Sequence, residues 1–165
     1  MSPTPASGRP ATLRDLRHHA DTLASILWNL GADVGGPFLD RYDAANVVVS
    51  VSASLPGPVA PAATEVVLQE LWEPTPGKRY RRVEYAYDFI DHPLRRRRAF
   101  HAHDVQHFIA EFDVVTHEHC EEILGAPACD HYFGLPVDAY DAIRRFALLW
   151  GRPGPLGCNE LRCMA

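Results

Sequence analysis

The sequence predicts an α+β protein, in which an antiparallel sheet of four to five strands is covered on one face by an N-terminal and a C-terminal helix. Two observations lead to this prediction. Segments with period-two alternation are grouped in the middle of the 165-residue chain, and apolar residues recur at helical spacing near both ends. Strand and helix patterns do not alternate along the chain, so a parallel sheet built from βαβ units is not expected.

The first expected element is a helix that follows Thr12, a residue type that caps helix N-termini, and ends at Gly31. Its apolar residues recur at alternating intervals of three and four, as in an amphipathic helix: Leu13, Leu16, Ala20, Leu23, Leu27 and Leu30. We expect this stripe to cover the sheet of its own chain. The alternative is a non-enzymatic interaction module, in which the stripe contacts a partner chain.

Strands are expected next, at residues 45–53, 66–73, 80–90, 95–103 and, as a fifth strand or edge segment, 114–119. In the third of these, Val83, Tyr85, Tyr87 and Phe89 alternate with Arg82, Glu84, Ala86 and Asp88. Strict alternation therefore places Arg82 on the face opposite Tyr85. A short helix is expected at 105–112.

The last element is a helix over 136–150, which starts at a proline and ends before a glycine. A chain of this length suits one compact domain, which we expect to span 11–151. Residues 1–10, rich in proline, serine and glycine, are expected to form a disordered tail, and residues 152–165 a mobile C-terminal tail.

Composition bears on whether the protein is in a membrane, secreted or in the cytoplasm. Hydrophobic residues make up 47% of the chain, yet no stretch approaches the roughly 18 uninterrupted apolar residues that a membrane span needs. The N-terminus lacks the features of a secretion signal, so a cytoplasmic protein is expected. Its four cysteines, without a C-x-x-C pair, are then expected to be thiols.

Positive charge is concentrated in one segment, although the formal net charge is −5. Residues 78–98 hold eight basic and three acidic residues. Guanidinium groups match phosphate oxygens, so this segment is a candidate phosphate or nucleic-acid surface. Its candidate residues are Arg79, Arg81, Arg82, Arg95, Arg96, Arg97 and Arg98. The alternative is a solvated hairpin edge that discourages aggregation.

Histidines are the candidate residues for acid–base catalysis or metal binding. Two His-x-His pairs follow the basic segment, His101 with His103 and His117 with His119, and on a strand the members of each pair lie on one face. His117 and His119 are candidate general base and acid, with His101 or His103 assisting. The same four side chains are alternative ligands for a divalent transition metal such as zinc. They are otherwise ordinary histidines that pair with neighbouring carboxylates.

Part of the chain, about residues 78–150, resembles TumE-type components of toxin–antitoxin systems. The similarity rests on a Tyr-x-Tyr strand within Tyr80 to Phe89, an arginine-bearing return strand that ends in Phe100, the His117-x-His119 element, and an aromatic pair, Tyr132-Phe133, before the terminal helix. The chain departs from that family after the return strand, where it has His101-Ala102-His103-Asp104 in place of a Tyr-Asp-Asn step.

The resemblance implies a small, dimer-prone protein that acts on RNA and pairs with an antitoxin. Together with the histidines beside the only basic segment, it leads to the expectation of an RNA-directed, ribonuclease-like activity. RNA, a cognate antitoxin and a second copy of the chain are the expected partners, and no membrane is expected. The metal-binding domain and the interaction module stay open as alternatives.

Overall fold

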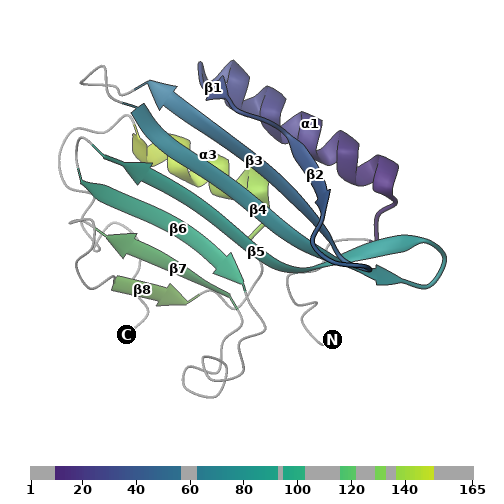
Figure 1. Cartoon of the computed structure of the whole chain (residues 1–165). Coiled ribbons are helices and arrows are strands. Elements are labelled where there is room, and N and C mark those ends of the chain that lie inside the picture. Colours follow the sequence, from purple (N-terminus) through teal and green to yellow (C-terminus); the bar gives the residue numbers. More distant parts are fainter. Residues whose placement is uncertain are drawn as a thin grey trace.

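The structure is a computed structural model that describes residues 10–56, 63–92, 95–102, 116–121, 129–132 and 137–150. These residues form an antiparallel sheet and two helices, which confirms the predicted α+β class. Both helices lie on the same face of the sheet (Figure 1). We call this face the helix face and the other one the open face.

The described elements follow one another as a helix, a run of strands and a helix. They are α1 (Leu13–Asn29), β1 (Asp33–Val34), β2 (Phe38–Arg41), β3 (Val47–Pro56), β4 (Ala63–Thr75), β5 (Arg79–Asp91), β6 (Arg96–Ala102), β7 (Thr116–Glu121), β8 (Cys129–Tyr132) and α3 (Ala139–Trp150). The strands are ordered β1-β3-β4-β5-β6-β7-β8, and β2 also pairs with β3. From β3 onward the sheet is therefore a meander in which each strand pairs with the next in sequence.

The predicted number of strands was too small, because the described residues alone contain eight. The five expected strands correspond to β3 through β7. The missed strands β1, β2 and β8 have two, four and four residues, too few for an alternating pattern to show. The expected helix at 105–112, the expected C-terminal tail at 152–165 and all but the last residue of the expected tail at 1–10 lie outside the described residues.

Helix α1 forms where its pattern predicted. Thr12 and Asp15 make a capping box, in which each side chain accepts a hydrogen bond from the backbone N–H of the other residue. The stripe residues Leu16, Ala20, Leu23 and Leu27 are buried on the sheet of the same chain. Leu13 and Leu30, at the two ends of the stripe, are 46% and 36% exposed. The middle of the stripe therefore covers the sheet of its own chain, as expected, and the interaction module stays a prediction.

A β-bulge changes the face of Arg82. The register between β4 and β5 shifts so that Leu71 lies opposite Glu84, while Trp72, the next residue, lies opposite Arg82. Val83 is the extra residue, and such an insertion inverts the alternation beyond it. Arg82 consequently lies on the helix face with 7% of its surface exposed, whereas strict alternation had placed it on the other face.

Aromatic side chains fill the core between the sheet and the helices. Phe89 of β5 stacks on Phe146 of α3 with a centroid separation of 4.3 Å, and Tyr85 stacks on Tyr87 at 4.7 Å. Phe100 of β6 meets the edge of Phe89. Offset-stacked and edge-to-face contacts add to the free energy gained by burying these rings, and the Phe89–Phe146 stack joins α3 to β5.

Candidate functional site

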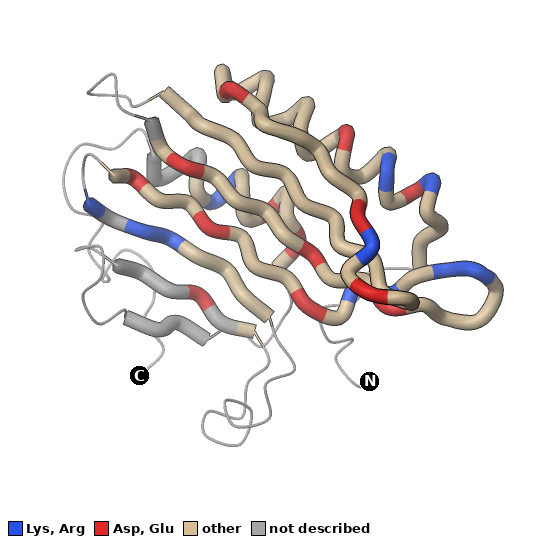
Figure 2. The backbone as a smooth tube through the Cα atoms, in the orientation of Figure 1, with Lys and Arg blue, Asp and Glu red and all other residues tan. Residues whose placement is uncertain are grey.

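The predicted arginine surface is divided between two ends of the sheet. Arg79 pairs with Thr75 at the start of β5, whereas Arg96 pairs with Asp91 at its end. β5 has 13 residues, so at about 3.3 Å per residue these ends are on the order of 40 Å apart. Figure 2 shows the two groups of basic residues at opposite ends. The expectation that they form one phosphate surface was wrong.

Two of the predicted phosphate-binding arginines are not on the surface. Arg82 and Arg98 are 7% and 5% exposed on the helix face, each beside a buried glutamate, Glu70 and Glu118 respectively. Arg79, Arg81 and Arg95 are exposed. The reason is the pairing of strands, which turns every second side chain of β5 and β6 into the core whatever its charge.

On the open face, His101 belongs to a small ionic cluster. Its Nε2 atom lies 3.2 Å from Oδ2 of Asp88, and Arg97 donates from Nε to Oδ1 of the same carboxylate at 2.8 Å. Burial alone would raise the pKa of Asp88, but the hydrogen bond and charge of His101 and the charge of Arg97 outweigh it and lower the pKa. Asp88 is thus held as a carboxylate beside an imidazole.

Strand register brings one predicted histidine of each pair together. In the pairing of β6 with β7, His117 lies directly opposite His101, and His119 lies opposite Ala99. Directly opposite residues of antiparallel strands share a face, with Cα atoms about 4.5–5.5 Å apart. His103 and the side chains of His117 and His119 lie outside the described residues. Among the side chains that the structure describes, no three His, Cys, Asp or Glu residues form a metal site.

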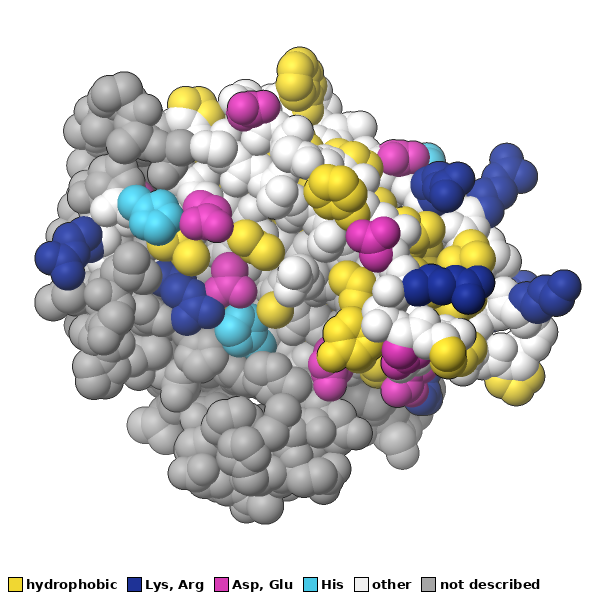
Figure 3. Space-filling view, viewed as in Figure 1, with side chains coloured by type: hydrophobic (Ala, Val, Ile, Leu, Met, Phe, Trp, Pro, Cys, Tyr) yellow, Lys and Arg dark blue, Asp and Glu magenta, His cyan; other side chains and the backbone are white. Residues whose placement is uncertain are grey.

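A groove of about 300 Å³ lies next to this cluster. Its lining consists of Tyr42, Val48, Gln69, Glu70, Leu71, Glu84, Tyr85, Ala86 and Ala102. Ala86 is the register partner of His101, so the groove adjoins the histidine on the open face. Figure 3 views this face, where histidine, arginine and acidic side chains gather near the residues that the structure does not describe. Neither Asp88 nor His101 is part of the lining, so the groove lies beside this pair.

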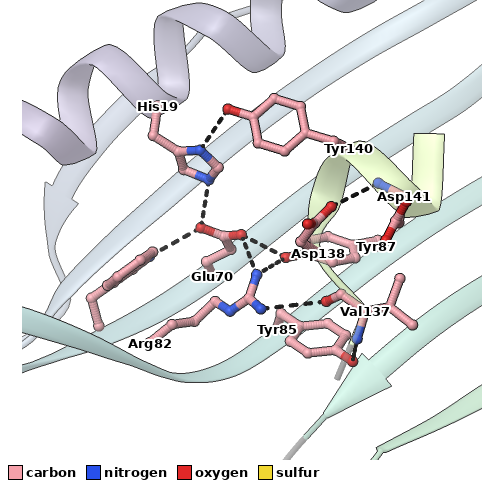
Figure 4. Close-up of polar contacts among 10 residues, drawn as sticks. His19, Glu70, Arg82, Tyr85, Tyr87, Val137, Asp138, Tyr140 and Asp141 are labelled. Carbon is pink, nitrogen blue, oxygen red and sulfur yellow. Dashed lines mark hydrogen bonds and ion pairs between the residues drawn. The ribbon is translucent and has the colours of Figure 1, made fainter. Parts of the chain in front are cut away.

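A second polar cluster, centred on Glu70, was not predicted (Figure 4). Glu70 is 2% exposed, and its Oε1 atom accepts hydrogen bonds from Tyr87 at 2.5 Å and from Arg82 at 2.9 Å. Its Oε2 atom contacts Nε1 of Trp72 at 3.1 Å and Nε2 of His19 at 2.9 Å. Four donors thus surround one buried carboxylate, which satisfies its capacity to accept hydrogen bonds.

This environment favours the charged form of Glu70. Burial alone would raise the pKa of its carboxyl, but the hydrogen bond and charge of His19 and the charge of Arg82 outweigh burial and lower the pKa from 4.5 to about 2. The other ring nitrogen of His19, Nδ1, lies 3.1 Å from the hydroxyl of Tyr140 on α3. Three residues distant in sequence therefore form a chain from a buried carboxylate through an imidazole to a phenol.

A signal for this cluster exists in the sequence. Glu70 occupies an inward position of β4, where Val66, Leu68 and Trp72 also point to the core, so a single carboxylate interrupts an apolar series. A buried carboxylate requires partners, and His19 lies three residues after Leu16 on the buried side of α1. The sequence does not show that these two residues meet, because the contact depends on how α1 packs on the sheet.

Comparisons with known proteins give no indication of function, so the proposals below depend on the fold and on these two sites. The chain matches no protein-family model, no curated protein and no solved structure. Neither helix in the described part of the chain is long and apolar enough to cross a lipid bilayer.

Proposed function

We propose that the open face carries an acid–base site that cleaves RNA, with His101 and His117 as its paired histidines. The observation that supports this proposal is the contact between His101 and Asp88 at 3.2 Å, combined with the register that sets His117 opposite His101. A carboxylate on one imidazole nitrogen fixes its tautomer and orientation and stabilises the imidazolium that forms when the histidine takes a proton.

Cleavage of an RNA phosphodiester requires two proton transfers, and two histidines are suited to them. His101, held by Asp88, takes the proton of the 2′-hydroxyl as its oxygen bonds to phosphorus. His117 gives a proton to the 5′-oxygen as the P–O bond to it breaks, which leaves a 2′,3′-cyclic phosphate. Arg97 supplies a positive charge next to His101, since both bind the carboxylate of Asp88. The ring of Tyr42 in the adjoining groove offers a surface for a base.

The test is cleavage of a labelled RNA by the wild-type protein and by three variants. We expect His101→Ala and His117→Ala each to lower the rate by about 100-fold or more, the usual contribution of a general acid or base. His92→Ala is the matched control, because His92 also contacts a carboxylate, Glu65 at 3.0 Å, but it follows the end of β5 and contacts Glu65 instead of Asp88. Full activity of both His101→Ala and His117→Ala would contradict the proposal, as would equal loss in the control.

A metal centre is the second candidate function, and the same register favours it. Two imidazoles at directly opposite strand positions can bind one ion, and a metal-binding histidine usually has a carboxylate on its other nitrogen, as His101 has in Asp88. Elemental analysis of protein without an affinity tag separates the two proposals. Stoichiometric zinc or another transition metal that is lost in both His101→Ala and His117→Ala would favour the metal centre over a metal-free nuclease.

The partners implied by the resemblance to TumE-type proteins stay predictions: a cognate antitoxin and a second copy of the chain. Their test is co-expression of the open reading frame adjacent to the gene, followed by size-exclusion chromatography of the purified protein. Growth inhibition that depends on His101, and that the neighbouring product relieves, is the result expected of a toxin. The cytoplasmic location is likewise a prediction.

A further inference from the structure

We propose that Tyr140 is a nucleophile activated by His19 and Glu70, and that it accepts acyl groups from neutral carboxylic esters. This site differs from the proposed RNA site, since it uses neither His101 nor His117. Its components come from three elements that pack together, α1, β4 and α3 (Figure 4). The carboxylate, imidazole and hydroxyl are in the order found in hydrolases with a nucleophilic hydroxyl.

The tautomer of His19 follows from its partners. Glu70 is ionised and therefore only accepts hydrogen bonds, so Nε2 of His19 carries a proton and donates it across the 2.9 Å contact. In neutral imidazole the other nitrogen, Nδ1, is then an acceptor. In this neutral form, the Tyr140 hydroxyl, 3.1 Å from Nδ1, can donate its proton to that nitrogen. His19 is thus already oriented to remove the proton of Tyr140.

Solvent exposure increases along the hydrogen-bonded series from Glu70 through His19 to Tyr140. The side chain of Glu70 is 1% exposed and that of His19 is 20% exposed, while Tyr140 is 38% exposed. The carboxylate is consequently shielded from water and the base is partly exposed, while the phenol can be reached from solution. Tyr87, Arg82 and Trp72 hold Glu70 in place from the other side, so the carboxylate is fixed without help from an external ligand.

The negative charges of Glu70 and Asp138 near Tyr140 bear on whether its substrate is charged or neutral. Burial and the charges of Glu70 and Asp138 raise the pKa of Tyr140, so a free phenolate is disfavoured and the proton must leave as the new bond forms. In that step the Tyr140 oxygen bonds to the acyl carbon while its proton moves to Nδ1 of His19. The bond between the acyl carbon and the ester oxygen then breaks, and the departing oxygen takes that proton from Nδ1, so that an alcohol or phenol leaves. The same negative charges oppose anionic substrates such as phosphates, which favours uncharged esters.

The experiment uses p-nitrophenyl acetate, an uncharged ester, on the whole wild-type chain, with peptide mass spectrometry to locate acetyl groups. Tyr42 is an internal control, because it is 70% exposed and its hydroxyl has no hydrogen bond among the described residues. We expect Tyr140 to be acetylated at least about tenfold faster than Tyr42 despite its lower exposure, as general-base assistance predicts. Acetylation of Tyr42 at an equal or higher rate overturns the proposal.

Two variants test the role of His19. His19→Ala is expected to lower the acetylation rate of Tyr140 to that of Tyr42 and to leave Tyr42 unchanged, whereas His18→Ala, which alters the neighbouring histidine, should change neither rate. A Tyr140 rate that stays the same in His19→Ala overturns the proposal. If His19→Ala fails to fold, the comparison of Tyr140 with Tyr42 within the wild-type chain still decides it. None of these readouts depends on RNA cleavage.

Discussion

Two arginine–glutamate pairs are buried on the helix face, and their surroundings differ. In the first, Glu70 receives hydrogen bonds from Arg82 and Tyr87 and contacts Trp72 and His19. In the second, Glu118 lies 3.3 Å from Nη1 of Arg98, and neither of its carboxylate oxygens has a hydrogen-bond partner in the part of the chain that the structure describes. Both glutamates are almost fully buried, at 2% and 1% exposure.

The two carboxyl groups respond to burial in opposite ways. The pKa of Glu70 falls to about 2 because its partners outweigh burial, whereas burial raises the pKa of Glu118 against the weaker opposing charges of Arg98 and Arg145. The difference shows that burial by itself does not set the charge of a carboxyl group. The number and geometry of its hydrogen-bond donors decide whether it stays ionised.

The largest expected effect is the loss of Arg82. Arg82→Met removes one member of a buried ion pair and leaves the charge of Glu70 less compensated, which typically costs about 3–5 kcal/mol. The free energy of unfolding is measured by urea denaturation. Arg81→Met, on the exposed neighbour, is the control and should change stability by less than about 0.5 kcal/mol. Similar losses in both variants would contradict the prediction that the buried Arg82–Glu70 pair contributes more to stability than an exposed arginine.

The two glutamates should make the stability of the protein depend on pH in opposite ways. The pKa of Glu70 is lower in the folded state (about 2) than its ordinary value of 4.5, so Glu70 contributes stability above pH 4.5 that is lost as pH falls toward 2. The shift corresponds to about 3 kcal/mol. For Glu118, whose folded pKa is raised, the contribution is present below pH 4.5 and lost as pH rises. Denaturation of Glu70→Gln and Glu118→Gln between pH 3 and 7 should therefore show changes in pH dependence of opposite sign.

Replacing both members of an arginine–glutamate pair should have different effects for the two pairs. Replacing Arg98 with Met together with Glu118 with Leu is expected to leave stability unchanged or to raise it by about 1–4 kcal/mol, because apolar groups avoid the cost of desolvating two charges. The corresponding replacement of Arg82 and Glu70 should destabilise, since it leaves the donors of Tyr87 and Trp72 without their acceptor. Thermal or urea denaturation of the two double variants compares them directly, and equal changes would remove the distinction.

The smallest effect is expected at the exposed end of the Glu70 cluster. Tyr140→Phe removes the hydroxyl that bonds to His19 and should cost about 0.5–1.5 kcal/mol, the usual net value of one hydrogen bond. Tyr42→Phe, at an exposed tyrosine, is the matched control and should have almost no effect. A loss of several kcal/mol in Tyr140→Phe would mean that this hydroxyl holds α3 on the sheet.

Much of the fold was readable in the sequence because its signals are local. The intervals of three and four in α1 and the alternation in β3 through β5 depend only on which neighbouring side chains share a face, and a capping residue marks the start of α1. The two His-x-His pairs are also local patterns, and the structure places His101 on the open face beside Asp88. The short strands β1 and β2 carry too few residues for such a pattern.

What the sequence alone determined is therefore the α+β class, the stripe of α1 and the order of the main strands. The tertiary structure decided the face of Arg82, through a bulge that depends on the partner strand, and the separation of the arginines to two ends of β5. It also decided the meeting of His19, Glu70 and Tyr140, residues that lie up to 121 positions apart. Periodicity reports which side of an element a residue occupies, whereas strand register and helix packing, set by distant contacts, decide what it touches.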